Sequence, residues 1–363
     1  MPENPKEIVF VTERVTCSLA NMYSIPKSIK ERTLSQFEVT CGLIHVCEAL
    51  IFMHDTAKMV HLDLSPENIW ITPDGSWKLA GFGFSLSPDV GSTRYLLDCG
   101  TPATRYAAIP DMNYSAPELS TQPGNFSTAS DEWSLGCLIW ELFSLGVEAD
   151  GTTQKLVKVD DGNPLTHAYQ VQNLQPIAMD RVPEMLHSCL TALLSLDPSR
   201  RPSAARVKDC PYFSRGPVQT MRQLENLLQM DEAHQKDVLK NLQASLVHFP
   251  THLLVSMVIP KLAEVSNITD FASDLLPCLL FIGNKVDSTV FNTKIVPAMI
   301  PMITLSSPPE LVTQCYSILL KQLDMILEKG DNTFKNKYFL PILGRCLNSG
   351  YKQLQLPVLQ GLV

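Results

Sequence analysis

The 363-residue sequence lacks the patterns that mark several classes of protein. Its ten cysteines include no Cys-x-x-Cys pair, so neither a zinc ribbon nor a thioredoxin-type site is indicated, and we expect no metal site. Acidic residues outnumber basic ones, for a net charge of −8, which argues against a nucleic-acid partner. The N-terminus lacks the basic and then apolar order of a signal peptide, and no unbroken apolar run approaches the roughly 18 residues that span a bilayer. These absences predict a cytoplasmic protein with no transmembrane segment.

The first part of the chain has the patterns of short strands and one long helix. Its 45% hydrophobic content is enough to bury real cores. A β-branched and aromatic run predicts a strand at residues 8–13, and strands at 69–71 and 77–79 are joined by a Pro-Asp-Gly turn into a hairpin. Apolar residues at helical spacing predict a helix over about 33–54, with Ser35 as N-cap and a glutamate three residues later.

Within the first part, residues 85–113 are rich in proline and glycine, which predicts a long irregular segment. The composition changes near residue 214, and the part of the chain after it has almost purely helical patterns. The sequence therefore predicts two domains, residues 1–214 and residues 215–363.

Prolines recur just inside apolar segments of the second domain. Pro260, Pro297 and Pro341 lie 37 and 44 residues apart, intervals that bracket the period of about 40–47 residues of HEAT and armadillo repeats. Proline is tolerated in the first turn of a helix, so these prolines are interpreted as marking the starts of equivalent helices. Pro277 is a further proline of this kind and would start the repeats at a different position. A plain helical bundle without repeats is the alternative to a solenoid.

Five motifs in the first domain occur in the order and approximate spacing of the C-terminal lobe of a protein kinase. They are HLDLSPEN at 61–68, GFG at 81–83, APE at 116–118, DEWSLG at 131–136 and DPSRRP at 197–202. Any one of them alone would be a weak signal, but the ordered set predicts the lobe.

The residues that shape such a lobe are present. Glu118 and Arg201 are expected to form a buried ion pair that ties the end of the activation segment to the base of the lobe. Asp131 is expected to accept hydrogen bonds from backbone N–H groups of the catalytic loop. These three residues are therefore predicted to be structural.

The residues that perform phosphoryl transfer are depleted. Asp63 matches the catalytic base and Asn68 the metal-coordinating asparagine, but Gly81 replaces the aspartate that holds the main metal ion. Ser65 stands where kinases have a lysine, and Leu62 replaces the arginine that reads a phosphorylated activation loop. Because the protein contributes mainly electrostatic stabilisation to this reaction, Asp63 and Asn68 alone cannot restore it. They are interpreted as vestigial, and as polar loop residues that satisfy local backbone groups.

The sequence also lacks most of the N-terminal lobe of a kinase. Glu13 and Val15 already resemble the hinge, and no Gly-x-Gly-x-x-Gly loop precedes them. Binding of ATP and magnesium is therefore expected to be weak or absent, and no cofactor is required. The missing N-terminal lobe and the apolar end at residues 354–363 predict a piece of a longer protein. A truncated, non-functional product is a further interpretation.

A degraded kinase lobe followed by helical repeats resembles the Scy-like, or N-terminal-kinase-like, pseudokinases. The stretches LSPENI at 64–69 and GSWKLAGF at 75–82 are most similar to the branch associated with clathrin-coated vesicles. The resemblance implies a role in traffic between trans-Golgi, endosomes and cell surface, through binding of coat and adaptor proteins. It also implies a location peripheral to these membranes, with attachment through partners.

The predicted fold is mainly α: a kinase-like C-lobe with few short strands, followed by an all-α HEAT or armadillo solenoid. The predicted function is a non-catalytic scaffold or adaptor that binds proteins. The alternative is an atypical Ser/Thr kinase that transfers phosphate weakly from ATP through Asp63 and Asn68.

Overall fold

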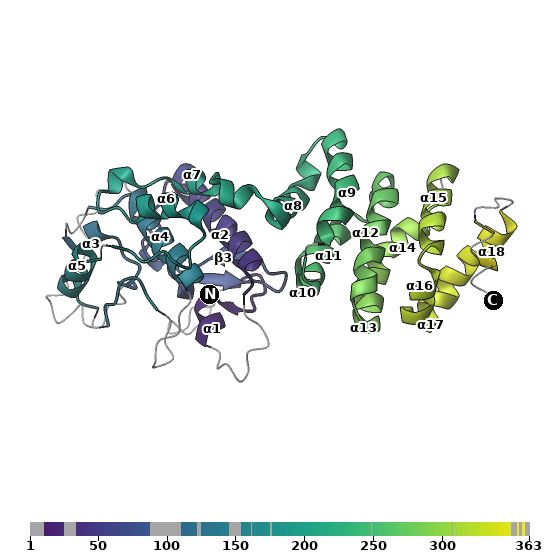
Figure 1. Ribbon diagram of the computed structural model, residues 1–363, viewed down its shortest axis with the longest axis horizontal. Helices are drawn as coiled ribbons and strands as arrows, with labels where there is room; N and C mark the ends of the chain where they lie inside the picture. Colours follow the sequence, from purple (N-terminus) through teal and green to yellow (C-terminus); the bar gives the residue numbers. More distant parts are fainter. Residues whose placement is uncertain are drawn as a thin grey trace, which may run out of the picture. The chain divides into compact units, whose positions relative to one another are not determined.

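The computed structural model describes most of the chain: residues 11–24, 34–87, 110–121, 125–144, 154–160, 162–174, 176–247, 249–306, 308–349, 354–355 and 358–359. The chain divides into two compact units, Met1–Arg215 and Gly216–Val363 (Figure 1). Most of the irregular segment predicted at residues 85–113 lies outside the described residues.

The first unit is mostly helical around one small sheet. Its strands are β1 (Cys17–Ser18), β2 (Ile69–Ile71) and β3 (Trp77–Leu79). Its helices are α1 (Leu19–Ser24), α2 (Gln36–Ile51), α3 (Pro117–Thr121), α4 (Thr128–Ser144), α5 (Pro164–Gln172), α6 (Glu184–Leu193) and α7 (Ala204–Lys208). A π turn at Phe52–Ala57 extends α2, and short 3-10 turns lie at Pro66–Asn68, Phe82–Phe84, Pro198–Arg200 and Pro211–Ser214.

The sheet is antiparallel in the order β1-β2-β3. Ile69 lies opposite Leu79 and Ile71 opposite Trp77, so the hairpin predicted at 69–71 and 77–79 is confirmed. The strand predicted at 8–13 is wrong over its described residues, 11–13, which form no ladder. The free edge of β2 pairs with Cys17–Ser18 instead, because an apolar run becomes a strand only where a sheet edge meets it.

Helix α2 is the central helix of the first unit. Ser35 Oγ accepts a hydrogen bond from the N–H of Glu38, and the Glu38 carboxylate accepts one from the N–H of Ser35, which confirms the predicted capping signal. Helix α2 packs against α4, α7 and β3. At Gly42 an added Cβ would lie 2.1 Å from the Trp77 ring, so glycine is required for this close approach.

The same helical segment has one property of a membrane span. Residues Gln36–Ala57 are long and apolar enough to cross a bilayer by length and composition alone, although no unbroken apolar run of that length is present. However, 61% of the apolar window is buried inside the protein. This burial is what a core helix requires.

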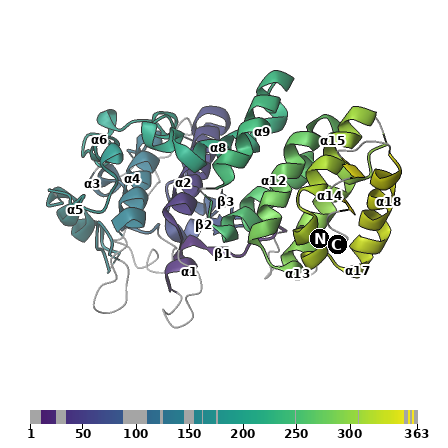
Figure 2. The same cartoon turned by 45° about the vertical axis from the view of Figure 1, so that its right-hand side comes forward.

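The regular elements of the second unit are all helical over its described residues. Its helices are α8 (Gly216–Glu225), α9 (Glu232–Leu246), α10 (Thr251–Leu253), α11 (Ile259–Val265), α12 (Ala272–Lys285), α13 (Ser288–Val290), α14 (Val296–Ile303), α15 (Pro309–Leu320), α16 (Leu323–Lys329), α17 (Asn332–Phe334) and α18 (Leu340–Asn348). Helix α12 packs against both α9 and α15, so these three helices form one layer (Figures 1 and 2). We call α9, α12 and α15 the A helices.

Three long helices of the second unit share an unusual build. Each has three α-helical residues, a five-residue π turn, and then a second α-helical stretch with proline at its second position. We call them the B helices: α10–α11, α13–α14 and α17–α18, with π turns at Leu254–Val258, Phe291–Ile295 and Lys335–Phe339.

The prolines therefore lie inside the B helices and not at their starts, which corrects the prediction. Pro260, Pro297 and Pro341 have no N–H, and a proline ring crowds the carbonyl four residues before it. A π turn directly before the proline widens the backbone there, so the helix continues past it. Pro277, the competing phase, lies inside α12 with no such turn. The same 37- and 44-residue intervals separate the N-caps of the B helices, Pro250, Asp287 and Asp331.

Candidate functional site

The loop that carries Asp63 is held in shape by one buried carboxylate. Asp131, in the first turn of α4, is fully buried and accepts hydrogen bonds from the backbone N–H groups of His61 at 2.7 Å and Leu62 at 2.8 Å. His54 Nε2 lies 2.8 Å from the same carboxylate. Leu62 has a φ of 64°, a strained backbone for a leucine, so these hydrogen bonds fix a loop that would not adopt this conformation alone.

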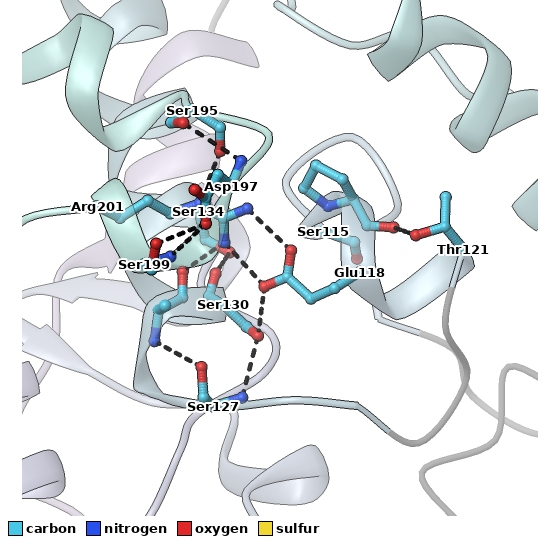
Figure 3. A network of polar contacts seen from close by, with 12 residues as sticks. Ser115, Glu118, Thr121, Ser127, Ser130, Ser134, Ser195, Asp197, Ser199 and Arg201 are labelled. Atoms are coloured by element: carbon cyan, nitrogen blue, oxygen red, sulfur yellow. Dashed lines mark hydrogen bonds and ion pairs between the residues drawn. The ribbon is translucent and has the colours of Figure 1, made fainter.

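A second buried charge network joins α3 to the base of the first unit. Arg201 Nη1 and Nη2 donate to the two Glu118 carboxylate oxygens at 2.8 and 2.9 Å (Figure 3). Ser130 Oγ donates to the same carboxylate at 2.9 Å. Arg201 also donates to the carbonyls of Ala129 at 2.7 Å and Ser195 at 2.9 Å. Each nitrogen of the guanidinium and each oxygen of the carboxylate therefore has a hydrogen-bond partner, as burial of a charge requires.

Asp63 is already occupied by donors from its own chain. Asn68 Nδ2 donates to Asp63 Oδ2 at 2.7 Å, and the backbone N–H of Asp111 donates to Asp63 Oδ1 at 3.0 Å. Burial raises the pKa of Asp63, while these two hydrogen bonds act in the opposite direction. A catalytic base needs an oxygen that can accept the substrate proton, and here both carboxylate oxygens have partners.

Gly81 lies directly against Asn68. Its φ is 75°, and an ideal Cβ at this position would lie 2.1 Å from Asn68 Oδ1. The amide of Asn68 therefore fills the space that a side chain at position 81 would enter. Restoring an aspartate at position 81 would push Asn68 away from Asp63.

We expect Gly81→Ala to lower the free energy of unfolding by about 1–3 kcal/mol, because it adds both positive-φ strain and a steric clash. Chemical denaturation of the full chain measures this loss. Gly83→Ala is the matched control, since an added Cβ at Gly83 meets no atom within 4 Å. In an Asn68→Ala background the cost of Gly81→Ala should fall, because the clash partner is gone. Equal costs in both backgrounds would contradict this geometry.

The site does not fit the magnesium ions of a protein kinase. Such ions need several carboxylate oxygens, and the site offers one carboxylate, Asp63, together with Asn68, which packs on Gly81. Among the residues that the structure describes, no group of three His, Cys, Asp or Glu side chains could hold a metal ion.

The other two substituted positions of the loop point into the protein. Leu62 is 3% exposed and Ser65 is 2% exposed. Asn68 Nδ2 lies 3.5 Å from Ser65 Oγ, at the limit of a hydrogen bond. A lysine at position 65 could not be accommodated there with its charge hydrated, so the loop is built around small and apolar side chains.

The residues predicted to be the hinge lie at the surface. Glu13 Oε1 is 3.5 Å from Lys78 Nζ, and both side chains are at least half exposed. Val15 is 37% exposed, and the chain then joins the sheet through the bond from Thr16 N–H to Ile71 O at 2.7 Å. An exposed ion pair of this kind contributes little to stability.

Two residues beside the site were missed by sequence reasoning. Glu132 Oε1 accepts a hydrogen bond from the N–H of Ala204 at 2.8 Å and lies 3.7 Å from His54 Nδ1. Its other oxygen is buried without a partner among the described residues. Burial raises the pKa of Glu132 to about 7, against the pull of the Ala204 hydrogen bond and of His54. The sequence signal that could have identified Glu132 is its position directly after Asp131.

Glu132 should make stability fall as pH rises. Because the pKa of Glu132 is raised, the folded protein keeps a proton that the unfolded chain releases above pH 4.5. The stabilisation from this proton is therefore complete below pH 4.5 and is lost as the pH rises to about 7. Between about pH 5 and 8 we expect the wild type to lose about 1–3 kcal/mol relative to Glu132→Gln, which cannot ionise. Urea denaturation across this range measures the difference. Parallel pH profiles for the two proteins would contradict it.

Asp111 links the loop to residues 155–159 and was also missed. Its carboxylate accepts from the backbone N–H of Asn113 at 3.0 Å, and it lies 3.4 Å from Lys155 Nζ. Asn113 Oδ1 in turn accepts from the N–H of Val159 at 2.8 Å. Asp63 is thus one member of a chain of hydrogen bonds that holds neighbouring segments together. Contacts this distant in sequence leave no local pattern.

Comparison with known proteins places the chain among kinase-like proteins. A protein kinase domain model matches residues 1–213. SCY1-like protein 2 of Mus musculus is 26% identical over an alignment of 359 residues, which covers 96% of this chain and 38% of that protein. Protein kinase domain-containing protein ppk32 of Schizosaccharomyces pombe is 28% identical over an alignment of 335 residues, which covers 90% of this chain and 42% of that protein.

A third relative carries a name that describes its chemistry. The probable inactive serine/threonine-protein kinase scy1 of Dictyostelium discoideum is 22% identical over 254 residues, 70% of this chain and 28% of that protein. The resemblance to Scy-like proteins is therefore confirmed. The chain spans about two fifths or less of the length of these relatives.

Proposed function

Because the chain belongs to the protein kinase domain family and has SCY1-like homologues, we propose that it is a non-catalytic, kinase-like scaffold that binds other proteins. One observation carries the proposal: the place of the missing carboxylate at Gly81 is filled by Asn68, which also engages Asp63. The lobe keeps its buried supports, Asp131 and the Glu118–Arg201 pair. A lobe that keeps these structural residues but lacks the metal-binding carboxylate is better suited to binding other proteins than to phosphoryl transfer.

The direct test is incubation of the full chain with labelled ATP and magnesium. We expect no transfer above background. Nucleotide at 100 times its dissociation constant would raise the free energy of unfolding by about 2.7 kcal/mol, so a thermal-shift assay at millimolar ATP should show no comparable change. Transfer that Asp63→Ala abolishes would overturn the proposal.

The alternative is an atypical Ser/Thr kinase. It is favoured by the retention of Asp63 and by the raised pKa of that carboxyl, since a base works best near the operating pH. It would require the bonds from Asn68 and the Asp111 N–H to open when substrate binds. The two functions separate in the ATP assay, because only the kinase gives labelled product that depends on Asp63.

For the second unit we propose a HEAT-type solenoid. Three features support it: the B helices repeat one build, the A helices pack in a row, and the N-cap intervals are 37 and 44 residues. A plain bundle would not require the same π turn before proline in each helix. Stacked repeats expose long faces on which partners bind.

We place the scaffold in vesicle traffic on the strength of its family. The resemblance implies coat or adaptor proteins of clathrin-coated vesicles as partners, at Golgi and endosomal membranes to which the protein is peripheral. Co-sedimentation of the full chain with assembled clathrin coats tests direct binding. Absence of the chain from the coat pellet would mean that these residues do not bind coats themselves.

A further inference from the structure

Helix α5 of the first unit presents an apolar patch to solvent. Leu165 is 79% exposed and Tyr169 is 67% exposed, the largest exposed fractions among the large apolar side chains of the described helices. Single exposed apolar residues are normal on a protein surface, but these two lie one helical turn apart and form a patch. Gln172 is exposed on the same side. We call Leu165, Tyr169 and Gln172 the α5 face.

The three side chains of the α5 face lie within a narrow sector of a regular α-helix. Each residue of such a helix is rotated by about 100° relative to the one before it. Tyr169 and Gln172 are therefore rotated by about 40° and −20° from Leu165. His167 and Val171, which are both buried, are rotated by about 200° and 240°. The α5 face thus points away from the side by which the helix packs on the protein.

The buried side of α5 is fixed to the first unit. His167 Nδ1 lies 2.8 Å from Ser120 Oγ, and His167 Nε2 lies 2.9 Å from the carbonyl oxygen of Ser115. Asn163 Oδ1 accepts a hydrogen bond from the N–H of Leu165 at 2.9 Å, which caps the start of the helix. Helices α3 and α5 lie side by side at the margin of the unit (Figures 1 and 2). A face held in this way loses little conformational freedom when it binds.

The sequence around the α5 face suits a contact with a copy of itself. Residues 162–179 contain no Asp, Glu, Lys or Arg, although 18% of the chain is charged. A charged side chain near a two-fold axis would meet the same charge of the other copy, and this segment has none to repel. The Tyr169 hydroxyl and the Gln172 amide can each donate and accept a hydrogen bond. The α5 face is therefore self-complementary in charge and in hydrogen bonding.

We propose that the α5 face is the contact between two copies of this chain. The two α5 helices lie antiparallel across a two-fold axis, with Tyr169 near the axis and Leu165 of each copy beside Gln172 of the other. This arrangement places the positive end of each helix dipole beside the negative end of its partner. Removal of the leucine and tyrosine side chains from water supplies the driving force. The proposal does not depend on the scaffold function, because self-association neither requires nor excludes phosphoryl transfer.

A second copy fits the α5 face better than an anionic membrane does. Helices that lie on such membranes combine apolar residues with Lys or Arg, and residues 162–179 contain neither. The nine-residue helix is about 13 Å long, so a contact centred on it is smaller than the roughly 800 Å² per partner of a standard interface. We therefore expect a weak dimer whose population rises with protein concentration.

Sedimentation velocity of the full chain over a range of concentrations tests the proposal. We expect the average mass of the wild type to rise from that of a monomer toward that of a dimer. Leu165→Glu should weaken the association by about tenfold or more, which corresponds to about 1.4 kcal/mol per factor of ten, because it buries a charge in an apolar contact. Leu196→Glu is the matched control and should leave the association unchanged, since Leu196 is a 49% exposed leucine outside α5.

Position 169 gives a test that only a two-fold contact passes. Tyr169→Glu and Tyr169→Lys should each remain monomeric, because like charges would meet near the axis. Mixing the two variants should restore the association, because each copy then meets the opposite charge. Thermal melts verify that each variant is folded, and a misfolded variant would not be rescued by mixing.

Three results would overturn the proposal. One is a wild type that stays monomeric at every concentration, whether or not it binds phosphatidylserine vesicles. Another is a dimer that Leu165→Glu weakens no more than Leu196→Glu does, which would place the contact on another surface. The third is a mixture of Tyr169→Glu and Tyr169→Lys that stays as dissociated as either variant alone.

Discussion

Replacing Arg201 with alanine is expected to lower the free energy of unfolding of the first unit by about 3–5 kcal/mol. The Glu118 carboxylate would remain buried with Ser130 as its only side-chain donor among the interactions described for it, and the carbonyls of Ala129 and Ser195 would each lose a donor. Leaving a buried charge without its partner is one of the most costly single changes in a protein. Urea denaturation, followed by tryptophan fluorescence, measures the loss.

Two further variants separate this mechanism from a general effect of losing an arginine. Arg200→Ala removes the neighbouring arginine, whose side chain is 78% exposed, and should change stability by less than about 0.5 kcal/mol. Glu118→Leu combined with Arg201→Met removes both charges and should recover much of the loss. The account is wrong if Arg201→Ala and Arg200→Ala unfold at the same denaturant concentration.

Asp131→Asn is expected to cost about 2–4 kcal/mol, because an amide has one accepting oxygen where the carboxylate has two. The N–H groups of His61 and Leu62 need one oxygen each, and His54 shares one of them. The amide nitrogen would therefore face a backbone N–H. The loop carrying Leu62 at positive φ would lose its support.

Hydrogen exchange gives this prediction a local readout. The amides of His61 and Leu62 should exchange faster in Asp131→Asn than expected from the fall in global stability, because their acceptor is lost as well. Asp55→Asn, at an exposed position of the same lobe, serves as the matched control and should leave both amides protected. Unchanged exchange at His61 and Leu62 would show that Asp131 does not hold the loop.

The elements that sequence predicted well are those fixed by neighbours in the chain. The capping box of Ser35 and Glu38 closes within three residues, and the Pro-Asp-Gly turn sets the hairpin of β2 and β3. The short strand expected at 8–13 failed because a strand needs a partner edge. That edge was taken by Cys17–Ser18, a pair with no strand pattern of its own.

The three prolines occupy equivalent places in helices of the same build, but they do not mark the starts of those helices. Proline chemistry alone favours the first turn of a helix. Pro297 instead follows a π turn within a helix that starts at Ser288, since the wider turn relieves the clash that makes interior proline costly. Helices α12 and α15 both pack against α14, the stretch that follows this π turn. Such packing is invisible in the local pattern.

The sequence by itself determined the family, through five ordered motifs, and the absence of the metal-binding carboxylate at Gly81. Only the tertiary structure decided what that absence means. Asn68 lies in the vacated space and bonds Asp63, and the Asp111 N–H takes the second oxygen of Asp63 from far along the chain. The identity of a side chain is written in the sequence. Which groups occupy its lone pairs depends on residues brought together by folding, because a hydrogen bond is set by distance and direction in space.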